Sequence, residues 1–311
     1  MKNQPQSFGR LPSLVGILAL ALGNPLWSGS VEYQKALASF KAERYLEAMV
    51  AIGKAIEQEP GNANHYQLQG DIFAALRQFT DAEKSLRRAI ELQPGTSDFH
   101  YRLSVLLLRS DRFGEAAASL EKAIELDPAS LKARFLLGNI EFLQLNHDEA
   151  ALQHLATVAK ADPRYPSVHF SLGRIFLRRA LDREAVEEFK AELQTNPEHA
   201  AARFLMAKAL LRARQPVEAL GHFQALRGKD VGQVLLHYFL AKTHHALEKP
   251  AEAIEALQKC IEMNPDFPDA HFLLARIYQE AGQLDRAAER MSVFEKLRER
   301  EQRGRPIDAV Q

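Results

Sequence analysis

The sequence is poor in cysteine and tryptophan, with one of each in 311 residues. Cys260 cannot form an internal disulfide, and the paired cysteines of a CxxC redox or zinc motif are missing. No cysteine follows the hydrophobic N-terminal segment to accept a lipid, which argues against a lipoprotein. The 40 basic and 40 acidic residues cancel, so the chain offers no net-charge attraction for nucleic acid or for a membrane surface.

Long hydrophobic runs are also scarce, and the conspicuous one is LPSLVGILALAL at residues 11–22. It follows Lys2 and Arg10 and is shorter than the roughly 20 residues that a transmembrane helix needs. These features are typical of a signal peptide, with a small-x-small cleavage site at 28–30 or at 19–21. We therefore predict a signal peptide over 1–30 and a periplasmic or secreted location. The alternative is an uncleaved N-terminal segment that anchors the chain in the inner membrane.

A period of 34 residues runs through the rest of the chain. An alanine repeats at this interval, except for one interval of 35 residues between Ala150 and Ala185. The series consists of Ala48, Ala82, Ala116, Ala150, Ala185, Ala219, Ala253 and Ala287. A second small residue precedes each of these alanines by twelve positions, and a proline closes most repeats. Self-similarity at a fixed period of this length is typical of a solenoid.

Each repeat contains two stretches of helical periodicity, for example HYRLSVLLLRS followed by FGEAAASLEKAIELD. The two stretches predict a helical hairpin. Small residues are needed where two helices cross closely, because a larger side chain would separate axes that usually lie about 8–10 Å apart. The closing proline cannot continue a helix and predicts its end.

The chain resembles the tetratricopeptide repeat family over residues 31 to 298. GDIFAALRQFTDAEKSLRRAIELQP and LARIYQEAGQLDRAAERMSVFEKL show the small-residue, alanine and bulky-apolar positions of the family in order. The resemblance implies an all-α fold, an α-solenoid with a right-handed superhelix of about eight helical hairpins. The repeats are expected near 31–62, 63–96, 97–130, 131–165, 166–199, 200–233, 234–267 and 268–298. Residues 299–311 are expected to form a charged helical cap and a frayed tail.

Three local expectations follow from the departures from this pattern. The extra residue of the fourth repeat is placed between Ala150 and Pro163, where it should bulge the second helix or lengthen the turn after it. The sixth repeat ends in LRGKDVG, which predicts an early helix stop at Gly228. Cys260 occupies a position that holds alanine in earlier repeats, so we expect it to be buried and unreactive.

No motif in the sequence indicates catalysis. A glycine-rich phosphate loop and a nucleophile elbow are both missing. The eleven histidines could suggest a metal, but four of them recur at one position of successive repeats and should lie on separate helices. These are His100, His169, His237 and His271. We therefore expect no enzyme activity, no metal and no cofactor.

The first helices of the last four repeats carry a recurring pair, an aromatic residue followed four positions later by a cation. Such a pair shares one helix face. The pairs are Phe170 with Arg174, Phe204 with Lys208, Tyr238 with Lys242, and Phe272 with Arg276. Arg178 and Arg212 would add to the positive charge, while Tyr101 and Phe135, the latter followed by Asn139, continue the aromatic positions toward the N-terminus. The family resemblance implies that these positions line the concave, ligand-facing groove.

The sequence thus predicts a non-catalytic, protein-binding scaffold or adaptor, in a cell-envelope or secretion-related assembly. A locally positive groove would suit an extended acidic peptide. One alternative is a module that binds anionic polysaccharide in exopolysaccharide or cell-wall handling, because sugar rings stack on aromatic faces. Another is an accessory subunit of an enzyme complex. Nucleic acid is not expected as a partner, and membrane contact is expected only through the N-terminal segment if it stays uncleaved.

Overall fold

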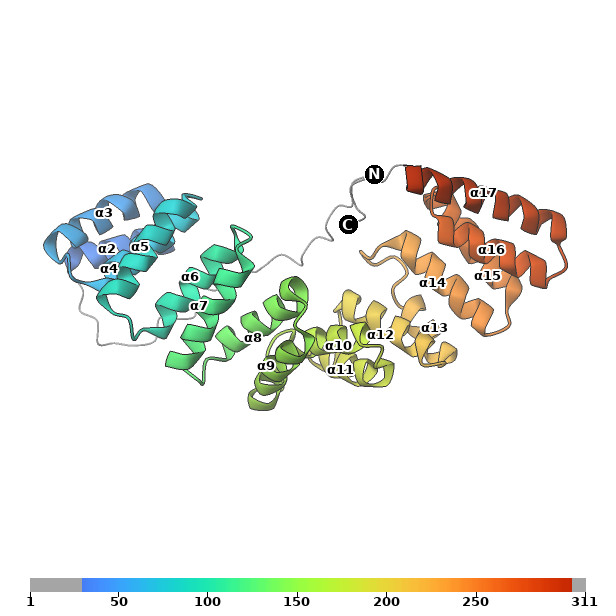
Figure 1. The fold of residues 1–311 in the computed structure, drawn as a ribbon, viewed down its shortest axis with the longest axis horizontal. Helices are drawn as coiled ribbons and strands as arrows, with labels where there is room; N and C mark the ends of the chain where they lie inside the picture. The colour runs from blue at the N-terminus through green and yellow to red at the C-terminus, as the bar shows by residue number, and fades with distance from the viewer. Residues whose placement is uncertain (1–29, 304–311) are drawn as a thin grey trace. The chain divides into compact units, whose positions relative to one another are not determined.

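A computed structural model describes residues 30–303, and every regular element in this range is a helix (Figure 1). The all-α prediction is therefore confirmed for the described residues. The predicted signal peptide lies outside them, apart from Ser30, as does the chain after Arg303. The described residues divide into two compact halves, 30–161 and 162–303.

The N-terminal half contains four helical hairpins. Its helices are α2 (Val31–Lys41), α3 (Tyr45–Gln58), α4 (Ala63–Ala75), α5 (Phe79–Leu92), α6 (Ser97–Leu108), α7 (Phe113–Leu126), α8 (Leu131–Ile140) with the π-helix η2 (Glu141–Leu145), and α9 (Asp148–Ala161). Each even-numbered helix is the first helix of a repeat and packs against the odd-numbered helix that follows it.

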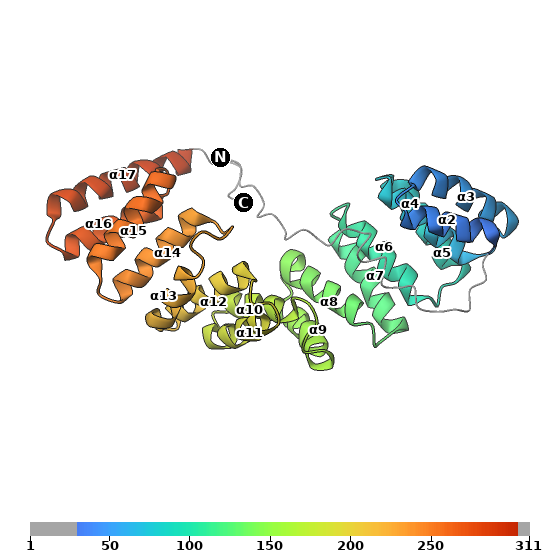
Figure 2. The same ribbon diagram turned by 180° about the vertical axis from the view of Figure 1, so that it is seen from behind.

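The C-terminal half contains four further hairpins. Its helices are α10 (Val168–Arg178), α11 (Asp182–Thr195), α12 (Ala200–Arg212), α13 (Pro216–Gln224), α14 (Gln233–Ala246), α15 (Pro250–Met263), α16 (Pro268–Glu280) and α17 (Leu284–Arg303). The first helices α10, α12, α14 and α16 contact one another in this order, as both views of the ribbon show (Figure 2). The last helix, α17, extends into the predicted charged cap as far as Arg303.

The small residues of the first helices lie where the second helix of the same repeat crosses. A Cβ atom added to Gly70 would come within 2.8 Å of Leu86 Cγ, and one added to Gly173 within 2.7 Å of a Phe189 ring carbon. Both contacts are too short for real carbon atoms, so glycine allows the bulky side chain to fill the crossing. The repeated pairing of a small residue with a bulky one therefore sets the hairpin geometry.

The turn between the two helices of every repeat contains one residue with a left-handed backbone. These residues have φ between 55° and 72° and are Glu43, Arg77, Asp111, Asn146, Ala180, Arg214, Glu248 and Gly282. In most repeats the N–H of the residue after this one donates to a carbonyl five residues earlier, as Gln78 N does to Phe73 O at 2.9 Å. This is the hydrogen bond of a Schellman helix ending. Because only one of the eight is glycine, composition gave no signal for these turns.

The fourth repeat holds its extra residue in the first helix, so the sequence-based prediction was wrong on this point. The last turns of that helix form the π-helix η2, and His147 N donates to Glu141 O across six residues at 2.8 Å. Ala151, fully buried, takes the position expected of Ala150. A π-turn absorbs one inserted residue without moving the helix that follows.

The second helix of the sixth repeat is short. Helix α13 has 9 residues, whereas the second helices before it have 14. The expected early stop is confirmed, but the helix ends at Gln224, before Gly228, which adopts a left-handed φ of 73°. Leu226 stays buried at 1% exposure, so the segment still closes the core.

The core of the C-terminal half is one continuous cluster of side chains from adjacent repeats, whereas the N-terminal half holds several smaller clusters. In the C-terminal half, Phe189, Phe223 and Leu257 are fully buried. Cys260 is also fully buried, as expected, and burial raises the pKa of its thiol to about 11. It therefore behaves as a small apolar side chain rather than a reactive thiolate.

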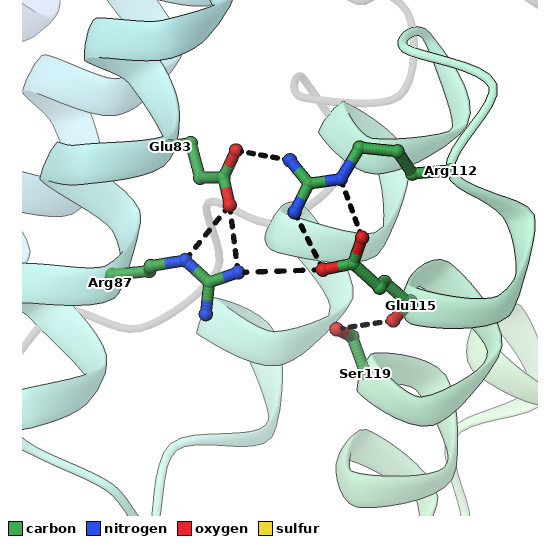
Figure 3. A network of polar contacts seen from close by, with 5 residues as sticks. All are labelled: Glu83, Arg87, Arg112, Glu115 and Ser119. Carbon is green, nitrogen blue, oxygen red and sulfur yellow. Dashed lines mark hydrogen bonds and ion pairs between the residues drawn. The ribbon is translucent and has the colours of Figure 1, made fainter.

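A network of charged side chains joins the second helices α5 and α7 (Figure 3). Arg112 donates to Glu83 at 2.6 Å and to Glu115 at 2.6 and 2.7 Å, while Arg87 donates to Glu83 at 2.7 Å. The hydrogen bonds from Arg112 and Arg87 lower the pKa of Glu83. Because the network is largely exposed, salt will screen it.

No helix among residues 30–303 is long and apolar enough to cross a membrane.

Candidate ligand-binding face on the first helices

The predicted aromatic–cation pairs of the C-terminal half lie along four successive first helices. We call this surface the aromatic–cation face; it comprises Phe170, Arg174, Phe204, Lys208, Tyr238, Lys242, Phe272 and Arg276. The guanidinium of Arg174 lies over the Phe170 ring at 5.7 Å, and the ammonium of Lys242 lies over the Tyr238 ring at 5.6 Å. The helical spacing of four residues thus brings ring and cation into direct contact in these two pairs.

Phe239 is the centre of this face, although the sequence pattern had singled out only its neighbour Tyr238. The rings of Phe204 and Tyr238 each lie 5.5 Å from the Phe239 ring, measured between centroids. The ammonium groups of Lys208 and Lys242 each lie 5.7 Å from the Phe239 centroid. The partly buried Phe239 ring therefore contacts two aromatic side chains and two cations from the helices α12 and α14.

Lys208 and Lys242 have no carboxylate within ion-pair distance in the part of the chain that the structure describes. Lys242 is exposed and Lys208 half-buried. Burial lowers the pKa of the Arg174 guanidinium and also that of the Arg178 guanidinium. The face therefore holds positive charge that the nearby side chains of α12 and α14 do not neutralise, and an anion bound there would be favoured electrostatically.

Two of the predicted cations already have acidic partners. Arg276 donates to Glu280 at 3.2 Å, and Glu280 also lies 2.7 Å from His245 Nε2. Arg212 Nε lies 3.1 Å from Asp182 Oδ1, which ties the end of α12 to the start of α11. These two arginines are engaged in contacts within the fold, unlike Lys208 on α12 and Lys242 on α14, which have no carboxylate partner among residues 30–303.

Of the predicted site residues of the N-terminal half, Tyr101 packs in the core and Asn139 bonds within its own helix. Tyr101 is 8% exposed and belongs to the hydrophobic core, with the Lys132 ammonium 4.4 Å from its ring centroid. Asn139 donates to the carbonyl of Phe135, one turn earlier in its own helix, at 2.8 Å. This burial and local bonding leave Tyr101 little surface for a ligand.

A buried ion network occupies the corresponding face of the N-terminal half, and sequence reasoning missed it. Arg102 donates to Asp71 and to Asp98, both at 2.6 Å, and Lys132 donates to Asp98 at 2.7 Å. Burial opposes the charge of Arg102, but the two aspartates outweigh it and raise its pKa; burial also raises the pKa of Asp71. The position that holds the cation in the later repeats is occupied by Val105 in the third repeat and by Asp71, 34 residues earlier, in the second. An acidic residue at this position was the available sequence signal for the network. Here the charges neutralise one another.

A buried glutamate supports the first pair of the aromatic–cation face. Glu192 is 3% exposed and stands where earlier repeats have Ala55, Ala89 and Ala123. Its carboxylate accepts hydrogen bonds from Phe170 N at 3.3 Å and from His199 Nδ1 at 2.8 Å. The His199 ring in turn lies 4.5 Å from the Phe170 ring. Glu192 thus replaces the missing side-chain cap at the start of α10 and holds Phe170 in place.

Three of the four recurring histidines, His100, His169 and His271, contact the turns between repeats. At this position a histidine or arginine side chain lies near the carbonyl of the proline that closes the preceding repeat. The pairs are His100 with Pro94 (3.3 Å), His169 with Pro163 (3.0 Å), His271 with Pro265 (2.9 Å), Arg134 with Pro128 (3.1 Å) and Arg203 with Pro197 (2.6 Å). No group of three histidine, cysteine, aspartate or glutamate side chains suited to a metal occurs among residues 30–303.

Family profiles match most of the helical region. Two profiles described as tetratricopeptide repeat match residues 68–130, 101–166 and 244–293, and the profile of subunit 3 of the anaphase-promoting complex, or cyclosome, matches 182–260. Together with the eight helical hairpins of 34-residue period, these matches decide the family. The chain belongs to the tetratricopeptide repeat family.

Solved structures of other tetratricopeptide repeat proteins share this fold. The C-terminal part of such a protein from Cytophaga hutchinsonii is 16% identical, with a TM-score of 0.64 over 78% of this chain and 99% of that one. PilW, described as a widely conserved type IV pilus biogenesis factor, is 20% identical, with a TM-score of 0.55 over 65% and 93%. YrrB, described as having an unusual peptide-binding site, is 18% identical, with a TM-score of 0.52 over 67% and 98%. No curated protein matches the sequence.

Proposed function

We propose that this tetratricopeptide repeat protein is a non-catalytic scaffold that binds an acidic segment of a protein partner on its aromatic–cation face. The observation that carries the proposal is the pair Lys208 and Lys242, which flank the Phe239 ring without a carboxylate partner in the described residues. A carboxylate between these cations would form charge-assisted hydrogen bonds, which are about twice as strong as neutral ones. Peptide binding by YrrB, a protein of the same fold, is in keeping with this role.

The binding test uses two anionic polymers that differ in backbone. Fluorescein-labelled polyglutamate and a labelled polyuronate are titrated with the full chain, and binding is followed by fluorescence anisotropy. We expect polyglutamate to bind more tightly, and the double variant Lys208→Gln/Lys242→Gln to weaken this binding at least tenfold. The matched control is Lys190→Gln/Lys259→Gln, whose lysines lie on the second helices α11 and α15 and pair with Glu187 and Glu255.

Each result separates the candidate functions. Preference for the polyuronate, with the same dependence on Lys208 and Lys242, would replace the protein-binding role by the polysaccharide-binding one. Polyglutamate binding that is equal in both double variants would remove the aromatic–cation face from the function. The alternative role as an accessory subunit would then be the one to pursue, by measuring whether the chain raises the activity of an enzyme with which it copurifies.

We further propose that the scaffold acts in the cell envelope after export. The support is the sequence of residues 1–30, with its positively charged start and its apolar segment at 11–22. N-terminal sequencing of the protein purified from its native cells tests this directly. We expect the mature chain to begin close to Val31; an intact Met1 in a membrane fraction would favour the uncleaved anchor instead.

A further inference from the structure

We infer that the partner segment binds the aromatic–cation face as a polyproline II helix with an acidic side chain at every third residue. This inference rests on the proposed function, since it takes for granted that the face binds an acidic segment. It adds the conformation and the sequence period of the partner. The contacts that bear on both lie between α12 and α14, around the Phe239 ring.

The face consists of two parallel rows, one aromatic and one cationic. On each first helix the aromatic residue precedes the cation by four positions, as in Phe204 and Lys208 or Tyr238 and Lys242. Four residues of α-helix rise about 6 Å. A segment that crosses the first helices would therefore have rings along one edge and cations along the other.

The contacts with Phe239 set an upper limit on the spacing along each row. Lys208 and Lys242 are each 5.7 Å from its centroid, so their ammonium groups lie no farther apart than twice that distance. The rings of Phe204 and Tyr238 are each 5.5 Å from it, which limits their separation in the same way. Packed helices are usually about 8–10 Å apart, which is compatible with both limits.

Among the regular backbone conformations, polyproline II repeats in the middle of the range of about 8–10 Å between packed helices. It has three residues per turn and rises about 3.1 Å per residue, so every third side chain returns to the same edge after about 9.3 Å. In a β-strand, same-face side chains recur after about 6.6 Å, and the third residue points to the opposite face. An α-helix turns every 5.4 Å, and its side chains i and i+7, which share a face, lie about 10.5 Å apart, beyond the usual separation of packed helices. A polyproline II partner can therefore place one acidic side chain at each successive first helix.

The aromatic row fits the remaining residues of such a partner. Proline-rich segments dock on grooves lined by aromatic side chains, because the conformation is already formed before binding and little entropy is lost. Tyr238 packs edge-on against Phe267 at 5.2 Å as well as against Phe239, so its ring is fixed and does not have to be ordered by the ligand. Phe272, 40% exposed, extends the aromatic row onto α16.

Three labelled peptides of twelve residues and equal charge test the inference. The first repeats Glu-Pro-Pro four times; the second has four glutamates followed by eight prolines; the third repeats Glu-Val-Thr four times and favours an extended strand. Each is titrated with the full chain, with the Lys208→Gln/Lys242→Gln variant and with the Lys190→Gln/Lys259→Gln control. Thermal unfolding of each variant, followed by circular dichroism, verifies that it is folded.

The Glu-Pro-Pro peptide is expected to bind at least tenfold more tightly than either of the other two. The Lys208→Gln/Lys242→Gln variant should lose at least tenfold in affinity, and the control should change less than twofold. Equal binding of the Glu-Val-Thr peptide, still dependent on Lys208 and Lys242, would overturn the polyproline II inference and leave the acidic-partner function standing. If neither these peptides nor polyglutamate depends on the two lysines, the inference and the proposed function both fall.

Discussion

At the scale of single residues, the cations of the first helices differ in what they contact. Arg276 and Arg212 have acidic partners within the fold, whereas Lys208 and Lys242 contact the rings of Phe239 and, for Lys242, Tyr238. The difference matters because a cation that already has a carboxylate partner gains little from an additional anion. Binding energy for an acidic ligand is therefore expected mainly from the two lysines.

Glu141 is a second residue whose chemistry depends on its surroundings. It lies in the π-helix of the fourth repeat, its Oε2 atom is buried without a hydrogen-bond partner, and His154 Nε2 is 3.9 Å away. Burial, with a smaller contribution from Glu121, raises the pKa of Glu141 to about 7. The folded state therefore favours the protonated acid, and the stability that this provides below about pH 4.5 is lost as the pH rises to about 7.

We predict that Glu141→Gln stabilises the protein at pH 8, where the wild-type carboxylate would be buried and charged. The gain in the free energy of unfolding should be on the order of 2 kcal/mol and should shrink to nearly nothing at pH 4. Urea denaturation of both proteins across this pH range measures the difference. The control is Glu125→Gln, an exposed acid paired with Lys122. A gain that is the same at pH 4 and pH 8 would contradict the raised pKa.

At the scale of elements, the turns between the two helices of a repeat carry conformational strain at seven non-glycine positions. Ala180 adopts a φ of 60° in the turn between α10 and α11, and its side chain is exposed. Left-handed backbone costs a residue with a Cβ roughly 1–2 kcal/mol, while glycine loses roughly 0.5–1 kcal/mol of chain entropy on folding. We predict that Ala180→Gly raises the free energy of unfolding by about 0.5–1 kcal/mol.

The eighth repeat provides the matched control for this prediction. Gly282 has a φ of 72° at the same position, so Gly282→Ala should destabilise the protein by a similar amount. Chemical denaturation of both variants gives the two changes. If Ala180→Gly were destabilising, the turn would be held by contacts of the alanine side chain and not by backbone conformation.

The ion network across α4, α6 and α8 makes a larger contribution. Arg102 is 13% exposed and bridges Asp71 and Asp98, so Arg102→Ala would leave the buried carboxylate of Asp71 without its cation, while the partly exposed Asp98 would keep Lys132. Losing one partner of a buried ion pair usually costs about 3–5 kcal/mol. We expect a loss of this size in the free energy of unfolding. Arg88→Ala, which removes an exposed pair with Glu91, should leave it nearly unchanged.

At the scale of the whole molecule, zero net charge coexists with a local excess of positive charge on the aromatic–cation face. Salt should therefore act on binding more than on folding. We predict that raising the ionic strength from about 0.05 M to 0.5 M weakens polyglutamate binding at least tenfold, because exposed charges are screened over a few ångströms at high salt. The Lys208→Gln/Lys242→Gln variant should show a much flatter dependence. A wild-type affinity that is independent of salt would contradict an electrostatic ligand site.

Much of the architecture could be predicted from the sequence because the repeat is local. The small residue, the alanine twelve positions later and the bulky anchor lie within one hairpin, so their spacing indicates the fold. The fourth repeat shows the limit of this reasoning. Ala150 and Ala151 are adjacent and chemically identical, and only the helix backbone shows that Ala151 is buried and that the extra residue lies in a π-turn.

The sequence alone determined that the chain is a helical solenoid of about eight hairpins. It also determined that aromatic and basic residues share one face on the first helix of each of the last four repeats. Only the tertiary structure decided how those charges are used. Asp71 and Arg102 come from different repeats, as do Lys208 and Phe239, and residues some 30 positions apart meet only when repeats stack. Pairing across repeats therefore decides which charges neutralise one another and which keep a cationic surface on α12 and α14.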